Sequence, residues 1–229
     1  MKIWNNILNL FFPPLCAVCN ERLMEGEEHL CLGCLSKLPV AEVGNFCDSS
    51  LEKLLAGRFP FCKAISYAVF QKEGMMQQIV HRFKYENDSK LAYFMGELCG
   101  AAFVGKCVVD DIDILVPVPL HAKRMRERGY NQSEEIARGM SSKSSIPVCA
   151  DVLHRKVNNP PQAQTQSRME RWQNVKNIFH VEEEIHLVGK HILLVDDVIT
   201  TGSTLEACAK ALLDVEGVRV SVFALATAR

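Results

Sequence analysis

The stretch that most constrains the fold lies near the C-terminal end, where Leu193–Thr204 reads LLVDDVITTGST. An apolar run that ends in two acids and passes into hydroxyl residues and a glycine predicts a buried strand, a tight loop and a helix. We place the strand at His191–Asp196 and the helix at Thr204–Leu213. Ligands of open α/β sheets bind outside the carboxyl ends of the strands. The sequence therefore predicts an α/β fold with a ligand site where this strand meets the helix.

Strand and helix patterns alternate along the rest of the chain. Strands are predicted over residues 63–70, 112–119, 147–154 and 218–226, and helices over residues 75–85, 90–103 and 131–140. Strands that alternate with helices imply parallel pairing, and continuous apolar runs suit strands that are covered on both faces. The chain has 229 residues, of which 48% are hydrophobic, enough for one such core. We expect this domain over residues 63–229 and a small module over residues 1–62.

Four of the ten cysteines have the spacing of metal ligands, in the pairs Cys16/Cys19 and Cys31/Cys34. Each CxxC pair can present two thiolates from one tight turn, and two pairs make a closed tetrahedral site. The pattern predicts a structural Zn²⁺, with structural thiols or a redox pair as the alternatives. The remaining cysteines are expected to be ordinary thiols: Cys47, Cys62, Cys99, Cys107, Cys149 and Cys208.

The loop after the two acids has the composition of a phosphate site. Its hydroxyl groups and its flexible backbone come from five consecutive residues: Thr200, Thr201, Gly202, Ser203 and Thr204. A glycine lets the backbone approach a phosphate closely, and a helix N-terminus favours negative charge. Asp196 and Asp197 cannot help to bind a phosphate, but they can accept hydrogen bonds from sugar hydroxyls or hold hydrated Mg²⁺. Together these residues predict a phosphorylated ribose as the ligand.

Two other classes of protein fit this stretch less well. The receiver domain of a response regulator also begins with a strand that ends in paired acids. Only 32 residues follow Asp197, however, which is too few for the rest of such a domain. No Walker P-loop pattern occurs in the chain, which argues against a nucleoside triphosphatase.

Positive charge is concentrated in the middle of the chain. The net charge is −1, yet Leu120–His180 carries eleven lysines and arginines against five acids. Such a segment favours an anionic ligand. Within it, Lys123–Arg128 (KRMRER) fits a solvated helix face as well as it fits contact with a ligand or nucleic acid. Tyr130 can stack on a base, although packing inside the protein is favoured, with Asn131 capping the next helix.

The apolar residues at the N-terminus fall on one helical face: Ile3, Trp4, Ile7, Leu8 and Phe11. We expect a short amphipathic helix packed on the body of the protein, with a membrane-surface helix as the alternative. The stretch lacks the small-residue cleavage site of a secretory signal. No run reaches the roughly 20 apolar residues of a transmembrane span. We therefore expect a protein of the reducing cytoplasm.

Taken in order, several segments resemble the ComF family, in which an N-terminal zinc-ribbon module is joined to a type I phosphoribosyltransferase domain. They are the four cysteines Cys16, Cys19, Cys31 and Cys34, then His81–Tyr85 (HRFKY), Val116–Leu120 (VPVPL), Arg128–Gln132 (RGYNQ), Arg168 with Asn174-Val175, and LLVDDVITTGST. The resemblance spans nearly the whole chain. It implies a parallel sheet flanked by helices. Many relatives carry further CxxC pairs, whereas here only Cys47 and Cys62 remain, so a second zinc site is not expected.

The resemblance also implies a ligand, 5-phosphoribosyl-1-diphosphate (PRPP), bound together with Mg²⁺. Asp196 and Asp197 would meet the ribose hydroxyls, and Thr200–Thr204 would hold the 5′-phosphate. The turn after Val116–Leu120 would bind the diphosphate, with Lys123 or Arg124 near it. Residues 155–178 match the hood loop of type I enzymes, from which four cations can close over the diphosphate: Arg155, Lys156, Arg168 and Arg171. The candidate catalytic residues are Asp196, Asp197 and Arg168.

Two functions stay open at this point. One is a phosphoribosyltransferase whose acceptor is unknown and is chosen by the hood and by residues 75–105. The other is a non-catalytic scaffold that keeps the PRPP fold and binds single-stranded DNA or competence partners. The resemblance implies a role in DNA uptake during natural transformation, or in the use of external DNA, alongside DNA-uptake proteins.

Overall fold

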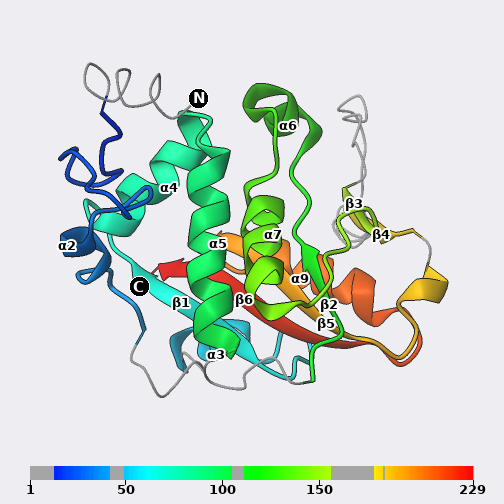
Figure 1. Cartoon of the computed structure of the whole chain (residues 1–229). Helices are drawn as coiled ribbons and strands as arrows, with labels where there is room; N and C mark the ends of the chain where they lie inside the picture. Colours follow the sequence, from blue (N-terminus) through cyan, green and yellow to red (C-terminus); the bar gives the residue numbers. More distant parts are fainter. Residues whose placement is uncertain (1–12, 42–48, 105–110, 156–177, 183, 229) are drawn as a thin grey trace, which may run out of the picture.

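The structure is a computed structural model, and it describes residues 13–41, 49–104, 111–155, 178–182 and 184–228. Its helices are α2 (Leu32–Leu35), α3 (Ser49–Leu55), α4 (Met75–Tyr85), α5 (Ser89–Val104), α6 (Ala122–Arg128), α7 (Gln132–Ser144) and α9 (Ser203–Leu213), with a 3-10 turn at Glu184–His186. Its strands are β1 (Ala64–Phe70), β2 (Ile114–Pro117), β3 (Leu153–Arg155), β4 (Phe179–Val181), β5 (His191–Ile199) and β6 (Arg219–Ala228). Figure 1 shows a central sheet with helices on both faces and the cysteine module beside α4.

The central sheet has four parallel strands in the order β1-β6-β5-β2. Short extended segments cover both of its outer edges. Beside β1, the Ala41 N–H donates to the Tyr67 carbonyl at 2.9 Å, and the Val69 N–H donates to the Pro39 carbonyl at 2.9 Å. Beside β2, Val148 forms a parallel bridge with Leu115. These pairings cover part of each edge and so shorten the row of open backbone groups on which another chain could add a strand.

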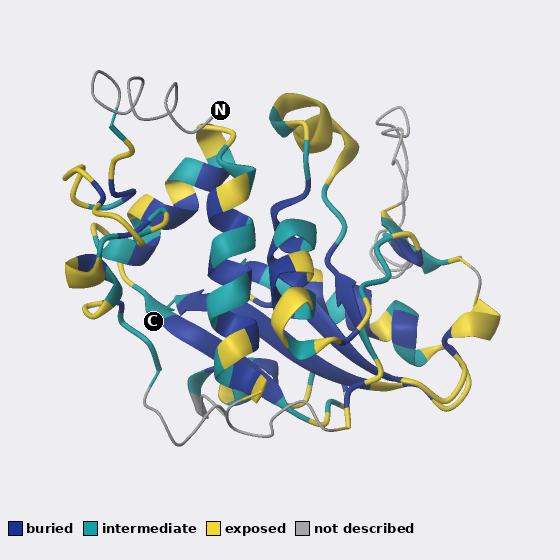
Figure 2. Cartoon of the chain, in the orientation of Figure 1, coloured by how far each residue is buried: buried dark blue, intermediate teal, exposed yellow. Residues whose placement is uncertain are grey.

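Side chains along β5 alternate between two hydrophobic layers. Leu193 and Val195 pack with residues of α4, α5 and α7. Ile192 and Leu194 pack instead with residues of α3 and α9. Figure 2 shows the sheet as buried ribbon between these layers. The prediction of an α/β fold with a parallel sheet covered on both faces is therefore confirmed.

The structure differs from the predicted elements in three places. The strand expected over residues 147–154 is reduced to the bridge at Val148 and the short β3, because Pro147 has no N–H to donate and residues 151–152 form a bend. β3 pairs antiparallel with β4, outside the main sheet. α3 forms in a segment for which no helix was predicted, and it buries Leu51 and Leu55 completely. β5 runs on to Ile199, because its register with β6 continues past the acids.

The cysteine module is built into the same core. Cys16, Leu23 and Leu30 belong to the hydrophobic cluster of α4 and α5. The His29 ring lies 5.4 Å from the ring of Phe94 on α5. A boundary at residue 62 stays a prediction, since module and domain share buried side chains. The expected N-terminal helix and the hood loop fall largely outside the described residues.

Helices α5 and α7 pack at backbone distance because three glycines face the contact. A Cβ on Gly96 would overlap the backbone of Ile136, and one on Gly100 would overlap that of Met140. A Cβ on Gly139 would overlap the carbonyl oxygen of Tyr93. The contact sets where α7, and with it the side chains at the start of α7, lie against the sheet.

Gly139→Ala is expected to destabilise the protein by about 1–3 kcal/mol, the usual cost of forcing an extra methyl group into a packed contact. In an unobstructed helix the same change would stabilise by about 1 kcal/mol, so the sign of the effect is diagnostic. Chemical denaturation measures it, with Arg138→Ala, an exposed neighbour on α7, as the control. An unchanged or raised stability in Gly139→Ala would show that the two helices do not approach this closely.

Among the described residues, no helix is long and apolar enough to cross a bilayer.

Candidate functional site

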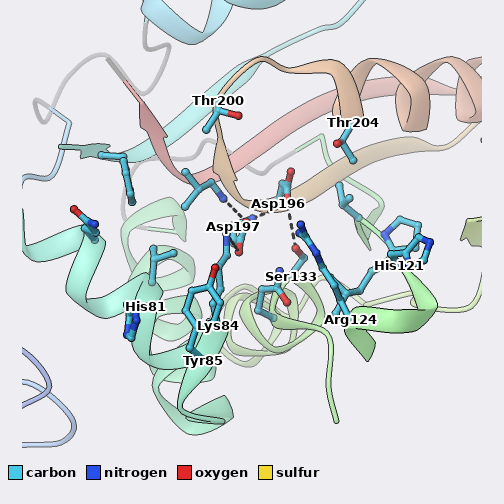
Figure 3. A pocket seen from close by; sticks show the side chains of 18 of the residues that line it. His81, Lys84, Tyr85, His121, Arg124, Ser133, Asp196, Asp197, Thr200 and Thr204 are labelled. Atoms are coloured by element: carbon cyan, nitrogen blue, oxygen red, sulfur yellow. Dashed lines mark hydrogen bonds and ion pairs between the residues drawn. The ribbon is translucent and has the colours of Figure 1, made fainter. Parts of the chain in front are cut away.

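A cavity of about 450 Å³ opens at the carboxyl end of β5. Most of its lining comes from α4, the loop from β2 to α6, the start of α7, and the end of β5 with the loop that follows it (Figure 3). The side chains with chemical function that line it are Gln77, His81, Lys84, Tyr85, His121, Arg124, Gln132, Ser133, Arg155, Asp196, Asp197, Thr200 and Thr204. Its place is the one that the strand and loop pattern predicts.

The two acids are held by the protein in different ways. Asp196 Oδ1 accepts hydrogen bonds from Ser133 Oγ at 3.2 Å and from the backbone N–H of Asp197 at 2.8 Å. Asp197 Oδ2 lies 2.7 Å from Lys84 Nζ on α4, and only 6% of the Asp197 side chain is exposed. Its other oxygen accepts the Val198 N–H at 2.6 Å. Asp197 is thus a neutralised carboxylate, whereas Asp196 has no ion-pair partner among the described residues.

This difference appears in the acidity of Asp196. Burial, together with the charge of Asp197 beside it, raises the pKa of Asp196 from 3.8 to about 7. The Asp197 N–H, Lys84 and Ser133 only partly offset this rise. Asp196 therefore changes its charge near neutral pH, at the position where a ligand would meet it.

The loop after β5 forms a small cradle of about 50 Å³, lined by Asp196 and residues 198–205. Gly202 caps α9 in the left-handed conformation, with φ of 75°. A side chain there would be strained, and its Cβ would lie 3.0 Å from Leu55 Cδ2. The hydroxyl residues Thr200, Thr201, Ser203 and Thr204 are all exposed. Exposed hydroxyls around the free N–H groups of a helix start are suited to hold a phosphate.

Cations approach the cavity from two other segments. Arg124 of α6 lines it, as does Arg155 at the end of β3, whose guanidinium lies 5.6 Å from the centre of the Phe179 ring. Lys123 does not line the cavity. Its ammonium lies 3.9 Å from Glu127 on the same helix, and its contact with diphosphate stays a prediction. The other predicted hood cations lie outside the described residues: Lys156, Arg168 and Arg171.

Sequence reasoning did not assign a role to Lys84 or Ser133, the two side chains that contact the paired acids. Lys84 lies in the HRFKY segment, but nothing local indicates that its ammonium reaches Asp197. Ser133 lies in the first turn of α7, two residues after Asn131. The Asn131 side chain caps this helix, as predicted, by accepting a hydrogen bond from the Ser133 N–H at 3.1 Å. Tyr130 packs inward, as favoured, and donates its hydroxyl to the Phe83 carbonyl. The Tyr130 contact and the bond from Asn131 Nδ2 to the Val118 carbonyl, at 3.0 Å, tie the start of α7 to the elements around the cavity.

Lys84→Met is expected to destabilise the protein by about 1–3 kcal/mol at neutral pH, because it leaves the buried Asp197 carboxylate beside Asp196 without its counter-charge. Lys84→Arg should lose less, since it keeps the charge. Thermal melting measures both changes, with the exposed Lys90→Met as the control. Equal melting temperatures for Lys84→Met and Lys90→Met would contradict the proposed neutralisation of Asp197.

The four cysteines of the module converge on one point. Their sulfur atoms all lie within 4.8 Å of one another, and Cys19 Sγ is 3.7 Å from Cys31 Sγ. With Zn–S bonds of about 2.3 Å, the edge of a tetrahedral site is about 3.8 Å. In the described part of the chain, this is the one such cluster of metal-ligating side chains. Cys62 is exposed and free, and Cys47 lies outside the described residues.

The acidity of these thiols also fits a bound metal. Burial alone would raise the pKa of Cys16, but N–H groups of Cys19, Cys31 and Val18 lower it to about 6. Burial and the neighbouring thiols raise the pKa of Cys34 to about 12. Four adjacent thiolates repel one another, and a divalent cation removes that repulsion. The cluster therefore supports the predicted structural zinc.

Family models of known proteins match both the N-terminal cysteine module and the C-terminal part of the chain. A family model described as phosphoribosyl transferase domain matches residues 127–229, and one described as double zinc ribbon domain matches residues 7–66. Fold and site together define a protein with a phosphoribosyltransferase domain and an N-terminal zinc ribbon. Three curated relatives are similar to the chain along most of its length, each at less than 30% identity.

These relatives match over most of both chains. Competence protein ComFC of Bacillus subtilis is 27% identical over 87% of this chain and 78% of its own length. Competence protein F of Haemophilus influenzae is 26% identical over 95% and 99%, and DNA utilization protein YhgH of Escherichia coli K12 is 27% identical over 92% and 89%. A solved structure of an allosteric regulatory enzyme of purine biosynthesis aligns with 58% of this chain and 26% of that chain, at 19% identity and a TM-score of 0.41, too low to add to the assignment.

Proposed function

We propose that the protein binds PRPP with Mg²⁺ in the cavity at the end of β5 and transfers the phosphoribosyl group to an acceptor. One observation carries the proposal. The paired acids, Thr200 and Thr204 of the hydroxyl loop, and the two arginines Arg124 and Arg155 all line the same cavity of about 450 Å³. A phosphorylated sugar diphosphate needs this combination: acceptors for its diol, donors for one phosphate, and cations for the other two.

Different residues of the cavity would contact the 5′-phosphate, the ribose and the diphosphate. The 5′-phosphate fits the 50 Å³ cradle of Thr200–Thr204 at the start of α9. The ribose hydroxyls would donate to Asp196 and Asp197, which lie between the cradle and α4. The diphosphate would then meet Arg124 and the loop that precedes α6. Arg155, and Arg168 from the predicted hood, would approach it from the other side.

Mg²⁺ bound with the diphosphate would neutralise charge on the leaving group. Because Asp197 is already paired with Lys84, the acids suit a hydrated ion better than direct coordination. Transfer breaks the bond from C1 of the ribose to the diphosphate and forms a bond from C1 to the acceptor. The arginines stabilise the departing anion, and closure of the cavity would exclude water from the cationic sugar.

The relatives' names connect this chemistry to DNA. Two of them are called competence proteins and one a DNA utilization protein. We propose that the protein acts in the cytoplasm, in the uptake or use of external DNA. The basic α6, with Lys123, Arg124, Arg126 and Arg128, provides a surface that could meet the phosphates of a single strand.

Diphosphate release tests the proposed activity. The full chain is mixed with Mg²⁺, PRPP and candidate acceptors, and the diphosphate formed is measured. Release that depends on an acceptor and is abolished by Asp197→Ala supports the transferase. Tight PRPP binding without release for any acceptor, together with salt-sensitive binding of single-stranded DNA, would instead support the non-catalytic scaffold.

A further inference from the structure

The cradle that would hold the 5′-phosphate has no cation in its own lining. A phosphate monoester carries a charge of about −1.5 to −2 at pH 7. The cradle offers the hydroxyl and N–H groups of Thr200–Thr204, and its lining also includes the acid Asp196. Among the described residues that line it there is no lysine or arginine. The 5′-phosphate would therefore need a counter-charge from outside this lining.

A guanidinium lies beside the loop on the side of α3. Arg58 follows this helix, and its Nη1 atom is 3.7 Å from the position that a Cβ on Gly202 would take. The same position is 3.0 Å from Leu55 Cδ2. Because Gly202 has no side chain, the Arg58 guanidinium can lie against the backbone of the loop, next to the start of α9.

The chain anchors Arg58 at this place. α3 ends at Leu55, and Gly57 takes the left-handed conformation that commonly follows the end of a helix, with φ of 75°. The Arg58 N–H donates to the Leu55 carbonyl at 3.1 Å. Leu55 and Phe59, on either side of this turn, are buried in the core that α9 shares. The backbone of Arg58 is thus fixed, while its side chain keeps 33% of its surface exposed.

One acid already lies near this guanidinium. Arg58 Nη1 is 3.5 Å from Oε2 of Glu206, in the first turn of α9. The other oxygen, Oε1, accepts a hydrogen bond from Lys210 Nζ at 2.6 Å. This hydrogen bond is the largest cause of the lowered pKa of Glu206, and the charge of Arg58 contributes less. Glu206 is therefore neutralised chiefly by Lys210, and its longer, partly exposed pair with Arg58 is weak.

The charges of these three side chains favour an anion at the start of α9. Arg58 and Lys210 share the single carboxylate of Glu206, which leaves one positive charge in excess. A planar guanidinium can donate to two oxygens of a phosphate at once, whereas an ammonium acts as a point charge. A phosphate in the cradle is thus a better partner for Arg58 than a carboxylate that Lys210 already holds.

We propose that Arg58 binds the 5′-phosphate of the ligand, an inference that rests on the proposed function of the cavity. On binding, the guanidinium exchanges Glu206 for phosphate oxygens, and Glu206 stays paired with Lys210. The loop Thr200–Thr204 then positions the phosphate, and Arg58 supplies its counter-charge. Arg58 selects phosphorylated sugars over free ones. It also gives α3, the helix between the cysteine module and the sheet in the sequence, a direct link to the ligand.

Calorimetric titration with ribose 5-phosphate tests the proposal, because this ligand carries the 5′-phosphate and lacks the diphosphate. With the zinc-loaded full chain, Arg58→Gln should weaken its binding about tenfold or more, as expected for loss of a hydrogen bond to a charged group. PRPP binding should weaken by the same factor. Arg58→Lys keeps the charge and should lose less. Lys53→Gln, which removes an exposed cation of α3, is the control and should bind like the wild type.

Glu206→Gln separates a ligand contact from a structural ion pair, because it breaks the same pair from the other side. If Arg58 contacts the phosphate, this variant frees the guanidinium and removes an acid beside the cradle, so it should bind ribose 5-phosphate more tightly than the wild type. If the pair only holds α3 against α9, Glu206→Gln and Arg58→Gln should weaken binding alike, which would overturn the proposal. Melting curves establish that both variants are folded at the temperature of the titration.

Failure of this proposal differs from failure of the proposed function. Equal binding of ribose 5-phosphate by Arg58→Gln and the wild type would refute the role of Arg58 and leave the cradle in place. A lack of binding by the wild type itself would reject the cradle, and both proposals with it.

Discussion

Asp196→Asn is expected to weaken PRPP binding by about 10–100-fold and, at about pH 8, to raise the melting temperature of the free protein. The first effect follows because a charged hydrogen-bond acceptor contributes about 1.5–3 kcal/mol, and 1.4 kcal/mol corresponds to tenfold in affinity. The second follows because Asp196, which has no ion-pair partner among the described residues, is forced to ionise beside Asp197. Asp196, which we expect to bind the ligand, would thus lower the stability of the free protein.

The direction of the Asp196 pKa shift determines how the stability of the folded protein should change with pH. The pKa of Asp196 is raised in the folded state, from 3.8 to about 7, so the folded protein binds the proton more tightly than the unfolded chain. Stability contributed by this group is therefore present at low pH and is lost as the pH rises from about 4 to about 7. The stabilisation by Asp196→Asn should be larger at about pH 8 than at about pH 6. The exposed Asp214→Asn is the control. A destabilised variant at pH 8 would show that the Asp196 charge is not strained.

Cys34→Ser is expected to have the largest effect on the fold. It removes one of four converging thiols, and structural zinc supplies folding free energy outright, about 10–16 kcal/mol in isolated zinc-binding peptides. The damage should reach beyond the module, because Cys16, Leu23 and Leu30 share a core with α4 and α5. We expect zinc content to fall below about half an equivalent and the melting temperature to drop by about 10 °C or more.

The matched control for this variant is Cys62→Ser, at an exposed cysteine outside the cluster. It should keep about one equivalent of zinc and the melting temperature of the wild type. Metal analysis and melting curves on the purified full chain measure both quantities. Equal zinc content in Cys34→Ser and wild type would contradict the four-thiol site.

The comparison of sequence with structure shows what a local pattern can and cannot reveal. The strand, loop and helix of LLVDDVITTGST could be predicted because they follow one another in the chain, and the register of β5 with β6 only lengthens the strand. Lys84 could not be found, because its contact with Asp197 joins two elements far apart in the chain. Its partner becomes apparent only when α4 lies across the end of the sheet.

For the helices, too, the local pattern predicts where an element forms but not which contacts it makes with other elements. Amphipathic patterns located α4, α5 and α7 to within a few residues. Glycine lowers the intrinsic stability of a helix, yet the glycines of α5 and α7 are the places where the two backbones touch. The strand over 147–154 was predicted too long because apolar composition does not register that Pro147 lacks a donor. Composition predicts which elements form, whereas close contacts between elements decide where the functional side chains lie.

Calorimetric titration of the zinc-loaded full chain with PRPP in the presence of Mg²⁺ tests the central claim most directly. Binding at one site per chain is predicted, with a dissociation constant below about 1 mM. Asp196→Asn should weaken it, and the competing ligand ribose 5-phosphate should occupy the same cradle. The absence of both binding heat and a PRPP-induced rise in melting temperature would contradict the assignment of this cavity to phosphoribose.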